Sequence, residues 1–123
     1  MARDFNKTLE LIMQEDSRYK AGAYIFVRMA LDFATKQIAD KPIPKHVSTK
    51  DLLKAVVLFA RETFGPMSAV LFDEWNLKNS QDVGNVVFNM IRVGALVQSE
   101  NDRLEDFADV YDFKKEFVDY YKA

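Results

Sequence analysis

The segment at residues 80–113, SQDVGNVVFNMIRVGALVQSENDRLEDFADVYDF, limits the possible folds more than any other part of the chain. Apolar residues recur there at helical spacing and predict an amphipathic helix over residues 80–93, which a glycine ends. A strand at 95–98, the polar turn SEND and a return strand at 104–111 then predict a β-hairpin, although Asp106 and Asp109 weaken the return strand. We therefore expect a helix that leads directly into a hairpin.

A second helix is predicted over residues 49–64 because its start and stop signals are unusually complete. Ser48 can cap its first turn, and Asp51 stands three residues later, as in a shortened capping box. Gly65 follows at the position where a left-handed residue ends a helix, and Pro66 suits the first turn of the next one.

The rest of the chain is also expected to be mainly helical. A short helix and a long one over residues 18–39 form a predicted N-terminal helical pair within residues 1–40. Two prolines mark a linker at residues 41–47. A short helix over 66–75 and a short amphipathic helix at the end of the chain complete a core at residues 48–123. We expect all of these parts to form a single domain.

Composition places the chain in the soluble, cytoplasmic class. With 123 residues, 49% of them hydrophobic, it can form a core without disulfide or metal staples. It has no Cys, which excludes disulfides, thiol catalysis and thiolate metal sites. Charges near the N-terminus argue against a signal peptide, and no segment approaches about 18 continuous apolar residues. We therefore expect a cytoplasmic protein with no membrane span.

Five sequence clusters together resemble one family of small bacterial proteins of unknown function. They are RYKAGAYIFVRMAL, HVSTKDLL, FGPMSAVLFDEWN, DVGNVVFNMI and EDFADVYDF, and they cover nearly the whole chain. The pair FGPM and DVGNVVFN is the more specific part of the likeness. The resemblance implies a self-contained bacterial domain, and it brings no activity, cofactor or catalytic residue.

A second resemblance is architectural, to winged-helix domains. Residues 49–64, 66–75 and 80–93 would be the three helices, and 95–111 would be the wing. The segment GALVQSENDR is similar to the wing opening of many bacterial regulators. The expected fold is therefore mainly α with a small β-hairpin: an N-terminal helical pair attached to a winged-helix-like core.

Winged-helix architecture suggests DNA, but the charge opposes this. Polar side chains that could read adenine edges lie on the candidate recognition helix, at Ser80, Gln81, Asn85 and Asn89. Its only cation is Arg92 in the last turn, and Asp82 lies at the end that would approach DNA. Nucleic acid is therefore not the expected partner of this surface.

The predicted hairpin is strongly acidic. Its carboxylates are Glu100, Asp102, Glu105, Asp106 and Asp109, against Arg103 alone, and carboxylates near phosphates repel. The acidic run at residues 100–112 could bind a divalent cation, although it lacks the spacing and the glycine of an EF-hand loop. Alternatively, carboxylates such as Asp106 and Asp112 cap nearby backbone N–H groups.

The sequence offers little for catalysis. His46 is the only His, and it lies in the proline linker next to the helix cap. The chain has no P-loop, GxGxxG, HExxH or GxSxG motif. We therefore expect no enzyme activity, no catalytic residue, no cofactor, no metal site and no small-molecule ligand.

An aromatic-rich C-terminal half favours a role in protein interaction. The candidate surface consists of Trp75, Phe113, Phe117, Tyr120 and Tyr121, because Tyr and Trp are common where one end of a ring stays wet. The alternative is that the long helix packs across this half and buries the rings. We expect a non-catalytic module that binds another protein or itself.

The alternative function is a nucleic-acid-binding regulator that uses a basic side running from Lys36 to Lys54. Residues 1–65 carry eleven Lys and Arg against eight Asp and Glu, a balance of +3. Residues 66–123 carry six against eleven, a balance of −5. Any nucleic-acid surface would therefore lie in the first half, where Asp40 and Asp51 interrupt the cations Lys36, Lys41, Lys45, His46, Lys50 and Lys54.

Overall fold

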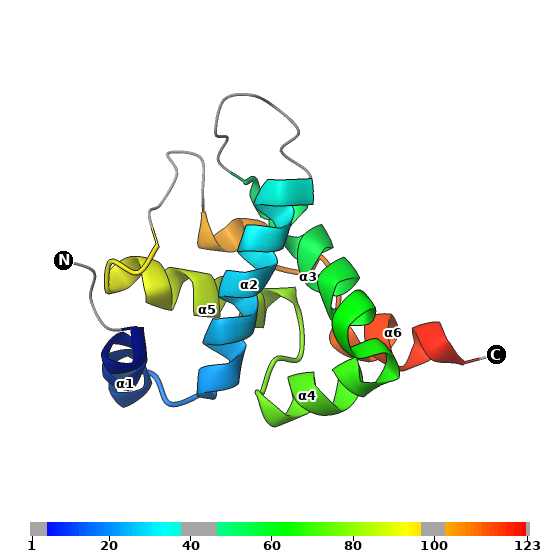
Figure 1. Ribbon diagram of the computed structural model, residues 1–123, viewed down its shortest axis with the longest axis horizontal. Helices are drawn as coiled ribbons and strands as arrows, with labels where there is room; N and C mark the ends of the chain where they lie inside the picture. The colour runs from blue at the N-terminus through cyan, green and yellow to red at the C-terminus, as the bar shows by residue number, and fades with distance from the viewer. Residues whose placement is uncertain (1–4, 38–46, 97–102, 123) are drawn as a thin grey trace.

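A computed structural model describes residues 5–37, 47–96 and 103–122, and the named elements within these ranges are all helical (Figure 1). The α-helices are α1 (Phe5–Glu15), α2 (Ala21–Gln37), α3 (Thr49–Phe64), α4 (Ser68–Glu74), α5 (Ser80–Arg92) and α6 (Phe113–Phe117). The 3-10 turns are η1 (Gly65–Met67), η2 (Leu104–Phe107) and η3 (Asp119–Tyr121).

Helix α2 runs through the middle of the molecule, with α1 and α5 on one side and α3 on the other (Figure 1). Its apolar surface is wide because it is covered on both sides. Tyr24 and Val27 are fully buried, and so are the small residues Ala23, Ala30 and Ala34. Small side chains along a helix allow its neighbours to approach closely, which makes α2 the axis of the core.

The predicted signals around helix α3 are confirmed. The Ser48 hydroxyl accepts a hydrogen bond from the backbone N–H of Asp51 at 3.1 Å. Gly65 has a φ of 56° and donates its N–H to the carbonyl of Arg61. The positive φ explains the glycine, because a residue with a Cβ is strained in this region.

The segment Thr49–Glu74 has the length and composition of a membrane-crossing helix, with a mean hydropathy of 1.4 over an 18-residue window that is 33% buried. The chain bends within this segment, because Gly65 and Pro66 separate α3 from α4 through the turn η1. Leu53 and Val56 of α3 and Phe72 of α4 belong to the hydrophobic core. Some of the apolar residues in this segment are therefore explained by packing in the core of the protein.

An aromatic cluster joins helices α2, α4 and α6. The ring of Phe72 lies 5.2 Å from Phe26 and 4.7 Å from each of Phe113 and Phe117, edge-on in all three cases. Phe113 and Phe117 stack on each other with ring centroids 5.2 Å apart. Edge-to-face and offset-stacked pairs are the favoured arrangements of aromatic rings. The short helix α6 is thus fixed to the core by two rings one turn apart.

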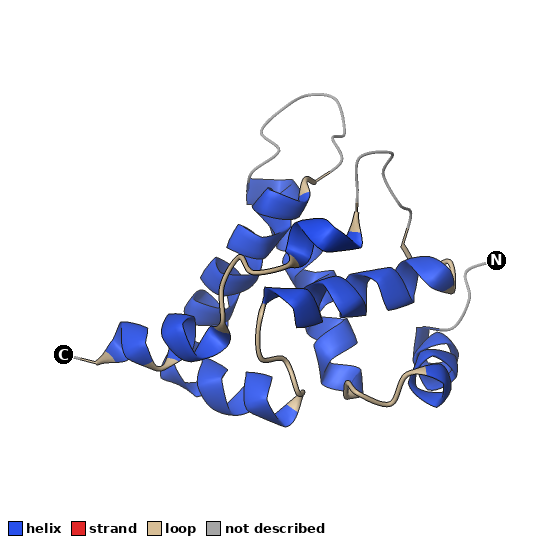
Figure 2. Cartoon of the chain, turned by 180° about the vertical axis from the view of Figure 1, so that it is seen from behind, coloured by secondary structure: helices blue, strands red, loops and turns tan. Residues whose placement is uncertain are grey.

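The predicted β-hairpin and winged-helix-like core are wrong. Where the return strand was expected, Leu104–Phe107 forms the turn η2, and the described residues contain no strand (Figure 2). Residues 97–102, which include the expected turn of the hairpin, lie outside the described ranges. Residues 104–111 therefore return to the core as a 3-10 turn followed by a loop.

Burial of one ring explains the turn. Leu104 and Phe107 are three residues apart, so one turn of 3-10 helix brings them to the same side. Phe107 is only 2% exposed and meets Phe88 of α5 edge-on at 6.2 Å. Gly84 leaves room for this ring, since a Cβ there would lie 2.6 Å from the Phe107 Cγ. The three-residue spacing of Leu104 and Phe107 is therefore the pattern that fits the structure.

Beyond η2 the chain returns along the start of α5 without forming a strand. Asp109 has a φ of 57°, which reverses the chain direction. The buried Ser80 hydroxyl accepts the backbone N–H of Val110 at 3.1 Å, and the Ser80 N–H donates to the carbonyl of Tyr111 at 3.0 Å. These bonds to the start of α5 satisfy backbone groups that a hairpin would have paired.

Trp75 closes one side of the aromatic cluster by packing directly on a glycine of α2. A Cβ placed on Gly22 would lie 2.1 Å from Nε1 of the indole, closer than any real contact. The same indole lies 5.6 Å from Phe26 and 5.5 Å from Phe72, measured between ring centroids. The close approach of Trp75, which follows α4, to α2 therefore depends on the missing side chain at position 22.

This contact predicts that Gly22→Ala has opposite effects on stability in the wild-type chain and in a Trp75→Ala variant. In the wild-type chain, Gly22→Ala should lower the free energy of unfolding by about 1–3 kcal/mol, because the methyl group overpacks against the indole. With Trp75→Ala present, the same change should raise it by up to about 1 kcal/mol, because Ala favours the helix. Urea unfolding followed by far-UV circular dichroism measures both. Equal effects in the two backgrounds would contradict the contact.

Candidate interaction surface

The polar side of helix α5 faces the protein interior at its N-terminal end. The buried Tyr19 hydroxyl donates to the Asp82 carboxylate at 2.6 Å and accepts the side-chain amide N–H of Asn85 at 2.9 Å. Asp82 also accepts the backbone N–H of Lys78 at 2.8 Å. Burial raises the pKa of the Tyr19 phenol, so the hydroxyl keeps its proton and remains a donor.

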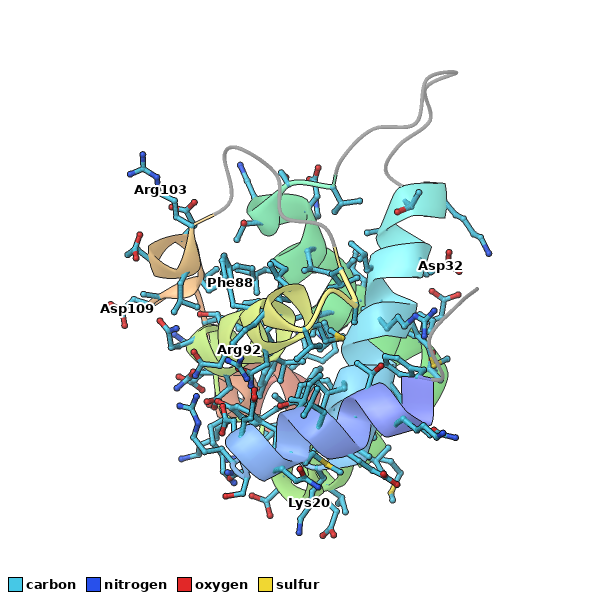
Figure 3. All side chains as sticks on the ribbon, turned by 90° about the vertical axis from the view of Figure 1, so that its left-hand side faces the viewer. Lys20, Asp32, Phe88, Arg92, Arg103 and Asp109 are labelled. Atoms are coloured by element: carbon cyan, nitrogen blue, oxygen red, sulfur yellow. The ribbon has the colours of Figure 1, made fainter. Side chains whose placement is uncertain are left out.

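A second set of polar contacts holds the other end of α5 against the connection between α1 and α2. Asn89 is 5% exposed and donates to Asp16 at 2.9 Å and to the Tyr24 hydroxyl at 3.0 Å. Arg92 donates to the Asn89 side-chain oxygen at 2.9 Å and pairs with Glu15 of α1 at 3.1 Å. Figure 3 shows Arg92 directly beside α1.

Asp16 is the charged centre of this second set. Its carboxylate accepts the Arg18 Nε at 2.9 Å and an Arg18 terminal nitrogen at 2.8 Å, a two-point ion pair. The hydrogen bonds from Arg18 hold the pKa of the Asp16 carboxyl well below its usual range, against the opposing effect of burial. We call these contacts between α5 and residues 15–24 the polar clasp.

The polar clasp uses the side chains that could have read DNA bases. Asn85 and Asn89 make side-chain hydrogen bonds inside the protein, and Gln81 donates to Asn85 at 3.2 Å. Ser80 is fully buried against the returning chain. The helix that the sequence offered as a recognition helix therefore directs these polar groups toward its own fold.

The five aromatic residues of the predicted surface divide into two groups. Phe113 and Phe117 are buried, and Trp75 is half-buried against α2, so these three rings belong to the core. Tyr120 and Tyr121 are 58% and 38% exposed, and their rings meet edge-on at 5.0 Å. Of the five residues, only the two tyrosines are exposed.

Arg61 fixes the position of Tyr120. Its guanidinium carbon lies 3.5 Å from the centre of the Tyr120 ring, and it donates to the backbone carbonyl of Glu116 at 2.9 Å and to its carboxylate at 3.3 Å. The contact combines a cation–π interaction with an ion pair across α3 and α6. No sequence pattern indicated a role for Arg61, which lies in the last turn of α3 and more than fifty positions before its partners.

Exposed apolar side chains lie at the same end of the molecule. Met67 and Val70 are 56% and 59% exposed at the corner between α3 and α4, and Val118 is 38% exposed after α6 (Figure 1). Val70 and Val118 line a groove of about 730 Å³ between α4 and α6. We define the C-terminal surface as Met67, Val70, Val118, Tyr120 and Tyr121.

The predicted acidic residues do not form a hairpin face. Glu105, Asp106 and Asp109 are exposed, and Figure 3 shows Asp109 pointing away from the helices. Glu100 and Asp102 lie outside the described residues. No group of His, Cys, Asp and Glu in the described ranges could hold a metal ion.

Asp112 shows the capping role that was one of the two alternatives for the acidic run. Its carboxylate accepts the backbone N–H of Lys115 at 2.9 Å, at the N-terminus of α6. This bond satisfies one free N–H group of the first turn.

The basic side from Lys36 to Lys54 is described only in part. Lys36 pairs with Asp32 at 3.0 Å, and Lys50 and Lys54 are exposed on α3. The sequence also placed Lys41, Lys45 and His46 there, and these lie outside the described residues.

Comparisons with protein-family models, with curated proteins and with solved structures found no match to this chain.

The polar clasp predicts a pH-dependent loss of stability. A carboxyl whose pKa is lowered by folding stabilises the protein above its ordinary pKa, and this contribution disappears as the pH falls toward the folded value. At pH 7, Asp16→Asn should therefore reduce the free energy of unfolding by about 1–2 kcal/mol. The difference from wild type should shrink steadily below about pH 4.

Urea titrations from pH 7 to pH 2.5 measure this difference. Glu10→Gln, an exposed acidic position on α1, is the matched control and should leave stability almost unchanged. An Asp16→Asn effect that stays constant over the whole pH range would contradict the charged role of Asp16.

Proposed function

We propose that this protein is a non-catalytic interaction module that binds a partner protein through its C-terminal surface. The observation that carries the proposal is the pair Tyr120 and Tyr121, which stay exposed although neighbouring rings of the same segment are buried. A tyrosine presents a large apolar ring and a polar hydroxyl together, which suits a surface that is wet in one state and covered in another.

The support behind Tyr120 strengthens this proposal. Arg61 lies against one face of the ring and is itself paired with Glu116. Arg and Tyr are among the residues that most often dominate binding energy, and a ring held in place loses little conformational freedom when a partner binds. The contact thus prepares Tyr120 to act as an anchor.

The groove between α4 and α6 supplies a place for a partner side chain beside the tyrosines. Its floor includes Phe72 and Leu77, which are buried, and its rim carries Glu74, Lys78 and Lys114. An apolar floor with a rim of mixed charge favours a partner segment with an apolar residue flanked by polar ones. A cytoplasmic location belongs to the same proposal.

Replacing the two tyrosines tests the proposal. The double variant Tyr120→Ser, Tyr121→Ser should keep the far-UV circular dichroism spectrum and most of the stability, because both rings lie outside the hydrophobic core. It should retain less than about a tenth of the partner captured by the wild type, the loss expected when anchor residues are removed. Quantitative mass spectrometry of pull-downs from native lysate measures the capture.

Leu11→Ser is the matched control, because Leu11 is 41% exposed on α1 at the other end of the molecule. It should capture the same proteins as the wild type. If the tyrosine variant captured the same proteins in the same amounts, the C-terminal surface would not be the binding site.

A further inference from the structure

The outward side of α2 is apolar in its middle, although the helix is buried along its other sides. Ile25 and Met29, one turn apart, are 43% and 48% exposed. Beside them the rings of Phe33 and Phe59 lie 5.0 Å apart and bridge α2 to α3. Together with Phe5 of α1, these side chains line a groove of about 600 Å³. It lies on α2 and is separate from the C-terminal surface.

Charges alternate along the same side of α2. Arg28, Asp32 and Lys36 follow each other at intervals of four residues, so they form one line parallel to the groove. Figure 3 shows Asp32 at the outer edge of α2. Within one chain Arg28 lies over the ring of Phe5 at 4.4 Å, and Asp32 pairs with Lys36 at 3.0 Å.

This line of charges is complementary to itself when it is turned around. If a second α2 lies antiparallel, with the two-fold axis near Met29 and Ala30, Arg28 of each copy faces Asp32 of the other. The axis creates both pairs at once, because a two-fold interface repeats every contact. The same arrangement places the two Met29 side chains against each other at the centre. A line of one sign would have repelled its own copy.

We propose that the groove on α2 binds a second copy of this chain, as an antiparallel pair of α2 helices. Met29, Ile25 and Phe33 form the apolar centre, and the Arg28–Asp32 pairs set the register. Exposed methionine suits such a centre, because its flexible thioether side chain adapts to an irregular neighbour. The exposed part of one helix is smaller than a standard interface of about 800 Å² per partner, so we expect a dissociation constant on the order of 100 µM.

Sedimentation equilibrium from about 10 µM to about 1 mM protein, a range around the expected constant, tests the proposal. The wild-type chain should pass from monomer to dimer. Met29→Glu should weaken the association at least about tenfold, because it brings two carboxylates together at the axis. Val70→Glu is the matched control on the C-terminal surface, where Val70 is 59% exposed, and it should dimerise like the wild type.

Charge reversal tests the register. Arg28→Asp alone and Asp32→Arg alone should each weaken dimerisation about fivefold or more, because each puts like charges opposite one another. The double variant should regain wild-type association, because the reversed pairs are again complementary. Circular dichroism checks that each variant keeps its helical content.

Each other result would overturn the proposal. A chain that stays monomeric throughout the range does not use this groove for a second copy. Dimerisation that survives Met29→Glu uses another surface, and the variant lacking Tyr120 and Tyr121 shows whether that is the C-terminal one. If both single reversals weaken association and the double variant does not restore it, the helices do not pair antiparallel in this register.

Discussion

The ring of Phe72 joins three segments that are distant in the sequence. It contacts Phe26 of α2, Trp75 at the end of its own helix, and Phe113 and Phe117 of α6. Helix α6 is too short to be stable alone, and so are the turns on either side of it. Their positions, and therefore the exposure of Tyr120 and Tyr121 just beyond, follow from burial of the two phenylalanines against Phe72.

Helix α5 is held by apolar packing on one side and by hydrogen bonds and ion pairs on the other. Its apolar side contributes Val83, Val86 and Met90 to the core, whereas its polar side makes the clasp with residues 15–24. Buried polar groups are expensive unless each one has a partner. Tyr19 is satisfied by two side chains of α5, and Asn89 bonds to Asp16 before α2 and to Tyr24 within it, so these contacts fix how α1 and α2 lie against α5. A polar face on an amphipathic helix is therefore not always a face for solvent or for DNA.

The sequence predicted the helices well where the signals were local. Ser48, Asp51 and Gly65 fixed the ends of α3 through capping chemistry that involves only neighbouring residues. The strand predicted at residues 104–111 was wrong because distant groups decide the conformation there. Gly84 of α5 leaves room for the ring of Phe107.

The sequence predicted the exposure of only part of the candidate surface, because burial there also depends on distant groups. Tyr120 and Tyr121 are exposed, whereas Phe113 and Phe117, in the same aromatic segment, are buried. The packing of α6 on Phe72 decides which pair is buried, and the spacing of residues in the sequence does not predict that packing. The contact of Arg61 with Tyr120 depends on how the end of the chain packs against α3, so no local sequence pattern predicts it.

The contact between Trp75 and Gly22 has a spectroscopic consequence. Trp75 is the only tryptophan in the chain, so the intrinsic fluorescence excited near 295 nm reports one location. That location is the point just after α4 where the indole lies against Gly22 of α2 and two phenylalanine rings. Any event that moves α2, including one that acts on its opposite side, changes the surroundings of this indole. The fluorescence of Trp75 is thus an intrinsic probe of the position of α2.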